Sequence, residues 1–285
     1  MATLRLGAHE SISGGLANCV DRGLAAGCDV LQIFTKSNHQ WAGREYAAAE
    51  MNELFARIEQ TCIPIVASHA SYLINIGSPD DSLWHKSVDA LEDEVRRCEL
   101  LHIPNLVFHP GSHVGAGEPA GIERIAAGIN EILRRRPASP TTLCLETTAG
   151  QGSNLGYRFE QLRDIVERID ADNRIGICLD SCHIFAAGYP LAPATDYAAT
   201  MDQFGQIVGF DRIRLMHLND SVGALGSRRD RHAHIGEGEI GIDGFVHILR
   251  DPRLSAVPMV LETPKEEDLA EDAANLLLLR SLGAG

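Results

Sequence analysis

Residues 213–238 hold a high density of side chains that bind metal ions. His217 and Asp220 follow a short apolar run, and a loop rich in glycine and arginine comes next. Two carboxylates and two imidazoles then complete the segment: Asp230, His232, His234 and Glu237. Imidazole together with carboxylate suits zinc or a similar divalent ion, and arginine beside a metal suits a phosphate substrate. A polar surface loop would have the same composition, so the segment alone leaves both interpretations open.

The same residue types recur at the ends of five other apolar runs. Each of these runs has His, Asp or Glu as its last or next-to-last residue, and one has a further histidine three residues later. With those of the first segment, the candidate metal ligands are His69, His109, Glu146, Asp180, His183, His217, Asp230, His232 and Glu262. One histidine at the end of an apolar run is usually a hydrogen-bonded core residue. Six successive runs that end in ligand types favour a metal site instead.

This ligand set is larger than one ion needs, because a catalytic zinc usually takes about three protein ligands. The set fits two or three ions. Clustered divalent ions favour hydrolysis of a phosphodiester, because one ion lowers the pKa of bound water to about 7 while the others hold the attacking and leaving oxygens. Sugar isomerases also use metal–carboxylate sites, so they remain the alternative enzyme class.

The apolar runs are candidate strands that must position these ligands. They read as continuous stretches of Val, Ile and Leu, which is typical of parallel strands buried on both faces. The expected strands are Leu4–His9, Val30–Thr35, Ile63–His69, Asn105–His109, Thr142–Thr147, Ile175–Asp180, Ile213–Leu218 and Pro258–Thr263. Between and after them, apolar residues recur at helical spacing in residues 15–26, 47–61, 81–101, 120–136, 158–169, 195–208, 242–250 and 266–282.

Eight strand–helix pairs predict an α/β fold of the closed (β/α)8 TIM-barrel type. An open, doubly wound sheet is the alternative, but no Gly-x-Gly-x-x-Gly follows an early strand. No linker or low-complexity segment interrupts the pattern, so residues 1–285 are expected to form a single domain. In a barrel the carboxyl ends of the strands converge on one mouth, where barrel enzymes place their active sites.

The charge, hydropathy and cysteine content restrict the partners and the cellular compartment to be expected. The formal charge of −14 argues against a general polyanion binder, so any attraction to nucleic acid must be local, and bound metal ions could supply it. No apolar run approaches the roughly 18 residues of a membrane span, and the first 15 residues do not resemble a secretion signal. Seven cysteines at irregular spacings, without Cys-x-x-Cys, indicate reduced thiols in a cytoplasm.

Several motifs resemble those of the endonuclease IV family of apurinic/apyrimidinic (AP) endonucleases. They are SHASYLINIG (68–77), FHPGSH (108–113), LETTAGQGSNLG (145–156), LDSCHIFAAGY (179–189), MHLND (216–220), DRH (230–232), GEG (236–238) and LET (261–263). The resemblance extends over essentially the whole chain. It implies a barrel with three zinc ions at its mouth, held by the nine residues identified above.

Carried over position by position, the resemblance divides these residues among three ions. The first ion would take His69, His109 and Glu146; the second Glu146, Asp180, His217 and Glu262; and the third His183, Asp230 and His232. Glu146 would bridge the first two ions. Glu146 and Glu262 are also the residues expected to orient or deprotonate the attacking water.

The resemblance further implies a base excision repair enzyme, a zinc-dependent phosphoric-diester hydrolase of the deoxyribonuclease IV type. It would cleave double-stranded DNA on the 5′ side of an abasic site, leaving a 3′-hydroxyl and a 5′-deoxyribose phosphate, and would trim blocked 3′ ends. Such an enzyme would work as a monomer in the cytoplasm, at the nucleoid while on DNA. The alternatives are a sugar isomerase or epimerase, in which the third ligand set would be idle, and a non-catalytic DNA-binding protein, against which the acidic charge and complete ligand set argue.

The expected DNA contacts lie on loops at the mouth. Tyr72 matches the aromatic member of the family's minor-groove wedge, and inserted aromatic side chains kink DNA. His39 stands where well-known members place arginine, and a neutral imidazole lacks the permanent charge of that residue. We therefore expect weaker retention of abasic duplex than an arginine would give. The candidate phosphate contacts are Lys36, Arg228, Arg229 and Arg231.

Overall fold

The structure is a computed structural model that describes residues 4–170, 172–265 and 269–284. Its central feature is a closed barrel of parallel strands, ordered β1, β10, β7, β6, β5, β4, β3 and β2 around the ring. The strands are β1 (Leu6–Glu10), β2 (Val30–Phe34), β3 (Ile65–His69), β4 (Asn105–Phe108), β5 (Thr142–Glu146), β6 (Ile175–Asp180), β7 (Ile213–His217) and β10 (Met259–Leu261). The barrel predicted from the alternating pattern is confirmed.

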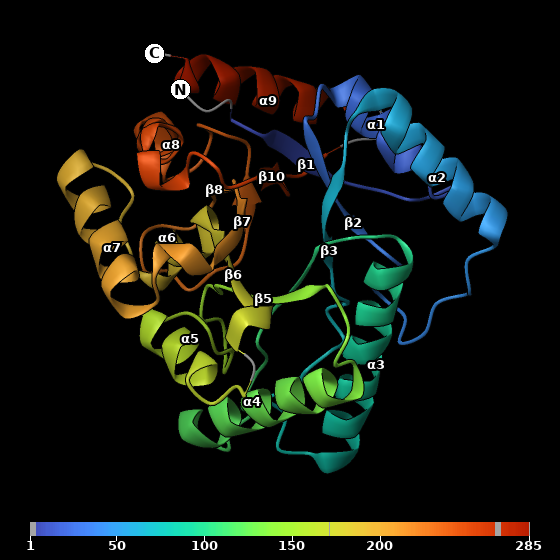
Figure 1. Cartoon of the computed structure of the whole chain (residues 1–285). Helices are drawn as coiled ribbons and strands as arrows, with labels where there is room; N and C mark the ends of the chain where they lie inside the picture. Colours follow the sequence, from blue (N-terminus) through green and yellow to red (C-terminus); the bar gives the residue numbers. More distant parts are fainter. Residues whose placement is uncertain (1–3, 171, 266–268, 285) are drawn as a thin grey trace.

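The helices form an outer ring around these strands (Figure 1). They are α1 (Asn18–Ala26), α2 (Ala48–Thr61), α3 (Asp81–Leu100), α4 (Glu118–Arg135), α5 (Phe159–Val166), α6 (Ser181–Ala187), α7 (Ala194–Ile207), α8 (Gly241–Arg250) and α9 (Ala270–Gly283). The short α6, which directly follows β6, was not predicted, because seven residues carry too little periodic signal. The predicted last helix began at 266, and residues 266–268 lie outside the described part of the chain.

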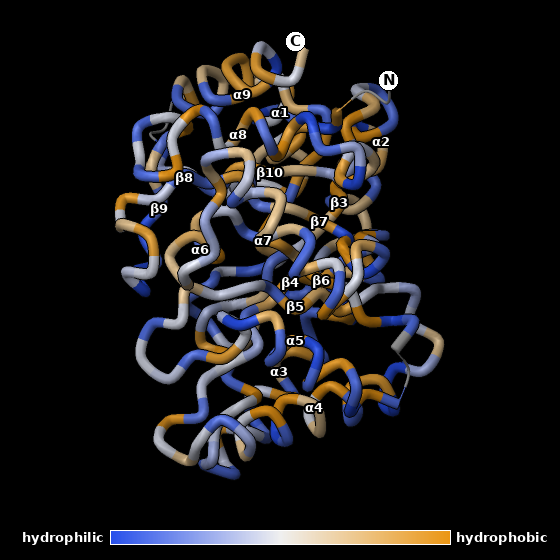
Figure 2. Tube along the Cα trace, turned by 90° about the vertical axis from the view of Figure 1, so that its left-hand side faces the viewer, coloured by the Kyte–Doolittle hydropathy of each residue, from blue (hydrophilic) through white to orange (hydrophobic). Residues whose placement is uncertain are grey.

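Helix α4 illustrates why these segments are helical and which face they bury. Its apolar residues recur at intervals of three and four, which places them on one side of the helix. Those buried against the barrel include Ile122, Ile125, Ile129, Ile132 and Leu133. Two arginines in the last turn offset the negative end of the helix dipole. Figure 2 shows the resulting alternation of hydrophobic and hydrophilic segments along α4.

The interior of the barrel contains a small cluster of buried side chains, separate from the larger core between strands and helices. We call it the floor; it comprises Val30, Val66, Ala67, Val107, Cys144, Cys178, Leu215 and Val260. Small and β-branched residues fit because eight strands leave space for side chains only. All seven cysteines are free thiols, as the sequence indicated, and six of them are buried.

A two-stranded hairpin extends the chain beyond β7. Its strands, β8 (Asp220–Ser221) and β9 (His232–Ala233), pair antiparallel and lie side by side in Figure 2. The buried Asp220 carboxylate accepts four backbone N–H groups, from Ser221, Gly236, Gly238 and Ile240, at 2.8–3.1 Å. The backbone at 238 comes so close that a Cβ atom would lie 2.5 Å from Asp220 Oδ1, which requires glycine. Within the described ranges, no helix has the length and apolarity to cross a membrane.

Candidate metal centre

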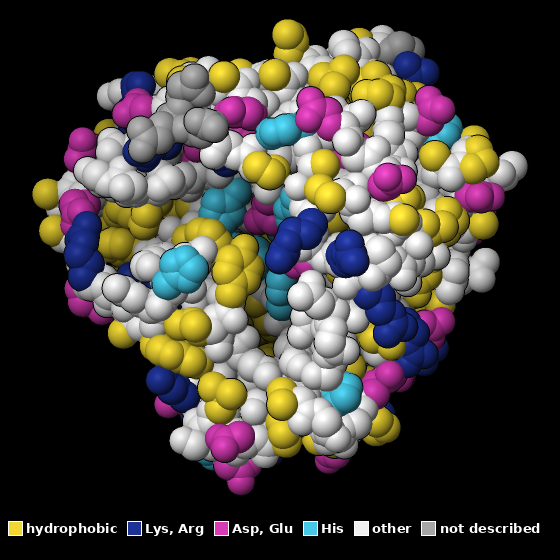
Figure 3. Space-filling model, turned by 180° about the vertical axis from the view of Figure 1, so that it is seen from behind, with side chains coloured by type: hydrophobic (Ala, Val, Ile, Leu, Met, Phe, Trp, Pro, Cys, Tyr) yellow, Lys and Arg dark blue, Asp and Glu magenta, His cyan; other side chains and the backbone are white. Residues whose placement is uncertain are grey.

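The register of the strands brings the predicted ligands together above the floor. Successive side chains of a strand point to opposite faces, so residues two apart share a face. Seven residues stand two positions after a floor residue: Gln32, His69, His109, Glu146, Asp180, His217 and Glu262. All but Gln32 are predicted ligands. Figure 3 shows the result from the mouth side, where histidine and carboxylate atoms lie in a central hollow with Lys and Arg side chains beside it.

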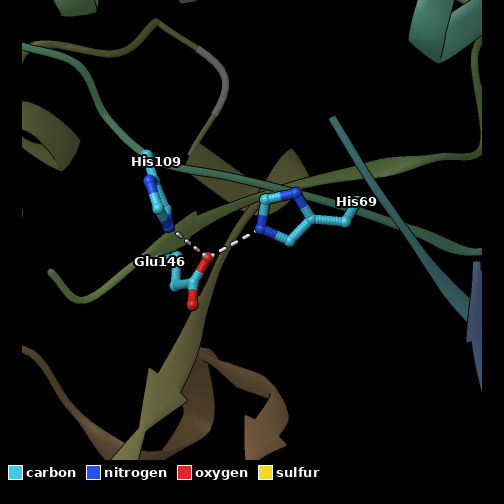
Figure 4. Close-up of side chains that lie close together, drawn as sticks. All are labelled: His69, His109 and Glu146. Carbon is cyan, nitrogen blue, oxygen red and sulfur yellow. Dashed lines mark hydrogen bonds and ion pairs between the residues drawn. The ribbon is translucent and has the colours of Figure 1, made fainter. Parts of the chain in front are cut away.

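His69, His109 and Glu146 form the first compact group. Glu146 Oε2 lies 2.9 Å from His69 Nε2 and 3.2 Å from His109 Nε2, as Figure 4 shows. His69 Nδ1 lies 2.7 Å from the carbonyl oxygen of Ala70, to which its N–H donates. That bond leaves the Nε2 lone pair directed at the site, which is the usual way a protein sets the tautomer of a metal-binding histidine.

Glu146, Asp180, His217 and Glu262 form the second group. His217 Nδ1 lies 3.0 Å from Glu146 Oε1, 3.3 Å from Glu262 Oε2 and 3.7 Å from Asp180 Oδ2. The two Glu146 oxygens therefore face different groups, Oε2 the first and Oε1 the second. This arrangement matches the bridging position expected from the sequence motifs.

The third predicted set is only partly assembled. Asp230 Oδ1 lies 3.1 Å from His183 Nε2 and 3.4 Å from His232 Nε2, so the carboxylate stands between the two rings. The compact groups instead combine His183 and Asp230 with His109. Both ring Nε2 atoms are buried, and within the described residues neither makes a well-aligned hydrogen bond. Two buried nitrogens that face one carboxylate in this way fit a cation bound between them.

Cys182 belongs to a further compact group, with Asp180 and His232, that was not predicted from the sequence. The thiol is buried, and burial raises its pKa to about 12, so it is protonated at neutral pH. Its Sγ–H lies 3.6 Å from the Arg231 carbonyl oxygen. The position next to a ligand histidine was the available signal, but the odd number and irregular spacing of the cysteines argue against thiolate ligands.

The electrostatics of the centre favour a cation. Burial alone would raise the pKa of the Glu146 carboxyl, but His109 and His217 hold that pKa well below its usual range. Burial would also lower the pKa of His183, yet Asp180 and Asp230 raise it well above the ordinary value. The carboxylates attract positive charge, which protons on histidine provide in the protein alone. A divalent ion would provide that charge in their place, so the donor set fits a metal.

Two of the expected DNA contacts, Tyr72 and Arg231, line an opening over these ligands. A cavity of about 280 Å³ is lined by Tyr72, His109, Gln151, Asn154, His183, Asp230, Arg231, His232 and Glu262. Tyr72 is 56% exposed, and its ring centroid lies 5.4 Å from that of His69. His39, Arg228, Arg229 and Arg231 are exposed. All five side chains are therefore accessible from solvent, and those of Tyr72 and Arg231 border the opening over the ligands.

Lys36 differs from the other expected phosphate contacts. Its side chain is 3% exposed and forms an ion pair with Glu94 of α3, which also accepts the hydroxyl of Thr35 at 2.6 Å. The prediction that Lys36 contacts phosphate is therefore wrong for this conformation, because its ammonium group is directed into the protein. The lysine instead ties the loop after β2 to α3.

Comparison with known proteins agrees with this architecture. Residues 20–281 match the family model described as a xylose isomerase-like TIM barrel. A probable endonuclease 4 of Chloroflexus aggregans is 49% identical over 98% of this chain and 97% of its own length. Endonuclease IV of Thermus thermophilus superposes with a TM-score of 0.85 at 40% identity, covering 98% of each chain.

A D-tagatose 3-epimerase-like protein is more distant, with a TM-score of 0.75 and 19% identity over 99% of this chain and 98% of its own. That likeness shows the shared barrel alone. The two endonucleases are similar to this chain in sequence as well as in fold, and over nearly their full lengths. The chain therefore belongs to the endonuclease IV family.

Proposed function

We propose that this protein is a zinc-dependent endonuclease of DNA repair that hydrolyses the phosphodiester 5′ to an abasic site. The products are a 3′-hydroxyl and a 5′-deoxyribose phosphate, and the same site trims blocked 3′ ends. Family membership supports the enzyme class, an endonuclease acting on DNA. The observation that carries the proposal is the convergence of imidazoles and carboxylates from six strand ends on one mouth.

We assign three zinc ions to this mouth. The first and second groups each offer at least three ligand atoms that lie within 4.8 Å of one another. The third ion would be held by Asp230 together with His183 and His232, whose buried Nε2 atoms face the Asp230 carboxylate. When bound, zinc supplies positive charge beside the phosphate and lowers the pKa of water to about 7.

The protein's own side chains provide orientation and recognition. Glu262 directs Oε2 toward the second group, where it orients the attacking water or accepts its proton, and Glu146 fixes the spacing of the first two groups. Tyr72 projects from the mouth as an apolar wedge for the gap at the missing base. The exposed guanidinium groups of Arg228, Arg229 and Arg231 contact phosphates, which offsets the overall charge of −14 locally. The enzyme acts as a monomer in the cytoplasm.

The decisive experiment is incision of a duplex oligonucleotide that contains one abasic site. We expect cleavage on the 5′ side, loss of cleavage after chelation, recovery on adding zinc, and about three zinc ions per chain. The same duplex with an intact base is the substrate control. Absence of incision by fully zinc-loaded protein would refute the function, and conversion of a ketose by that protein would favour the sugar epimerase.

A variant tests the assignment of Glu262. Glu262→Gln should bind the abasic duplex but lose incision about 10²- to 10⁴-fold, the usual contribution of a positioned acid or base. The matched control is Glu239→Gln, because Glu239 is an exposed carboxylate on the segment that follows β9 and is not a candidate ligand. Normal turnover by Glu262→Gln would contradict the role given to this residue.

A further inference from the structure

Two strands of the barrel contribute no predicted ligand to the mouth, and their inward-facing side chains need another explanation. On β2 the residue at the level of the ligands is Gln32, and on β1 it is His9. We infer that Gln32 is a positioning residue, which holds His217 and Glu262 in the orientations in which they bind the second ion. The inference rests on the proposed function, since it concerns the same metal site.

The contacts of Gln32 connect two strands that its own strand does not pair with. Its Oε1 lies 3.0 Å from His217 Nε2 on β7, and its Nε2 lies 2.6 Å from Glu262 Oε1 after β10. The Gln32 side chain is fully buried. One rigid amide therefore contacts two of the four residues in the second group.

The orientation of the amide follows from the chemistry of its partners. The ionised carboxylate of Glu262 only accepts hydrogen bonds, so the amide nitrogen must face it. The amide oxygen then faces His217 and accepts the N–H of Nε2. A histidine held with its proton on Nε2 presents the lone pair of Nδ1, and Nδ1 is the atom that faces the carboxylates of Glu146, Asp180 and Glu262.

The same amide separates the two oxygens of Glu262. Oε1 accepts the bond from Gln32 and lies 3.2 Å from His9 Nδ1, while Oε2 faces His217 Nδ1 at 3.3 Å. His9 Nδ1 also lies 3.0 Å from Gln32 Nε2, so β1 and β2 support the same oxygen. Oε1 of Glu262 is thereby held by side chains of β1 and β2, and Oε2 is left to bind the ion.

This arrangement predicts an effect on metal binding that a filler of buried space would not have. Partners that orient ligands typically change metal affinity about 10- to 100-fold when they are removed. A glutamine that merely fills the interior could be replaced by an apolar side chain of similar length without changing metal affinity. Gln32→Met is such a replacement, because it keeps the unbranched shape and removes the hydrogen bonds to His217, Glu262 and His9.

The matched control is Leu31→Met on the same strand. The side chain of Leu31 points away from the barrel interior and lies against Gly23 of α1. It is therefore on the opposite side of β2 from the ligands. Both variants introduce methionine into β2, so both report any general cost to the strand. Thermal unfolding of the metal-free proteins checks that each variant is folded.

Zinc affinity is then measured by competition with chelators of graded strength. We expect one of the bound ions to be held about 10- to 100-fold more weakly in Gln32→Met, with the full number of ions restored at saturating zinc and Leu31→Met unchanged.

A second substitution keeps the test decisive if methionine prevents folding. Gln32→Glu retains an oxygen that accepts from His217 but places a like charge beside Glu262, so it should also weaken one ion. Wild-type affinity for every ion in a folded Gln32→Met or Gln32→Glu protein would overturn the inference and leave the proposed function intact. Unfolding of both Gln32 variants while Leu31→Met folds would assign Gln32 to the fold and overturn it as well. Wild-type protein that binds no zinc would instead refute the proposed function.

Discussion

Replacing Asp220 by asparagine should be among the most destabilising single changes outside the metal ligands. The carboxylate accepts two N–H groups on Oδ1, from Ser221 and Ile240, and two on Oδ2, from Gly236 and Gly238. An asparagine can retain one of these pairs on its oxygen, but its NH₂ group then faces the other two donors. Two buried N–H groups lose their acceptor at each possible orientation of the amide.

The magnitude follows from these two lost bonds. A hydrogen bond to a charged group contributes about 1.5–3 kcal/mol, and a buried donor left without an acceptor costs about 1–3 kcal/mol. The two figures describe the same lost bond and are not added, so each of the two N–H groups costs about 2 kcal/mol. We therefore expect a loss of about 4 kcal/mol in the free energy of unfolding. The hairpin that pairs Ser221 with His232 would loosen with it, so zinc at the Asp230 position should also bind more weakly.

Urea unfolding of Asp220→Asn and wild-type protein, monitored by circular dichroism, measures this loss. The matched control is Asp80→Asn, since Asp80 is an exposed aspartate that caps α3 by accepting the N–H of Leu83 at 2.7 Å. Asparagine caps helices about as well as aspartate, so the control should change the free energy by less than about 0.5 kcal/mol. A loss below about 1 kcal/mol in Asp220→Asn would show that the four bonds do not stabilise the loop as reasoned.

Three further predictions concern groups away from the ligands. Glu94→Gln leaves the buried ammonium group of Lys36 without its counter-charge, so the free energy of unfolding should fall by about 3 kcal/mol. The affinity for duplex DNA should fall as well. A free energy equal to that of the wild type in urea unfolding would contradict this role of Glu94. Burial raises the pKa of Glu10 from 4.5 to about 7, despite the nearby Lys265, so folding loses stability as the pH rises from about 4.5 through 7. Glu10→Gln should therefore stabilise the protein by roughly 2–3 kcal/mol at pH 8 and by little at pH 4; equal melting temperatures at pH 8 would oppose this. His39→Arg should bind abasic duplex more tightly at neutral pH, and the slope of log affinity against log salt concentration should become steeper by roughly 0.9. Binding titrations at two salt concentrations measure both effects. Affinities equal to those of the wild type would contradict the prediction.

The ligands within strands were predictable because strand geometry leaves few choices. Once the apolar runs are read as parallel strands, a polar residue at the carboxyl end has to lie at the mouth, as His217 and Glu146 do. Gln32 carries the same kind of signal, a lone polar residue inside an apolar run, but it was not predicted because amides are not typical ligands. A polar side chain buried in a strand can support chemistry without taking part in it.

Features that depend on distant segments could not be read from the sequence. Lys36 was expected to contact phosphate, but its partner Glu94 lies 58 residues later in the chain. Glu94 approaches Lys36 only when α3 lies against the loop after β2. Similarly, the spacing of His183, Asp230 and His232 depends on how the loop between β8 and β9 folds back. Motifs identify which side chains belong to a site, whereas loop conformation decides how closely they meet.

Because the ligands stand two residues after the floor residues, each strand has a lower part that stabilises the fold and an upper part that faces the site. The lower part closes the cylinder with side chains that no solute reaches, and the upper part meets whatever enters from above. Substitutions at the two levels should thus have unlike consequences: below, a change in melting behaviour with the reaction preserved; above, altered chemistry on an intact scaffold. A barrel built in this way can acquire a different reaction through substitutions in the upper level while the packing of the lower level stays unchanged.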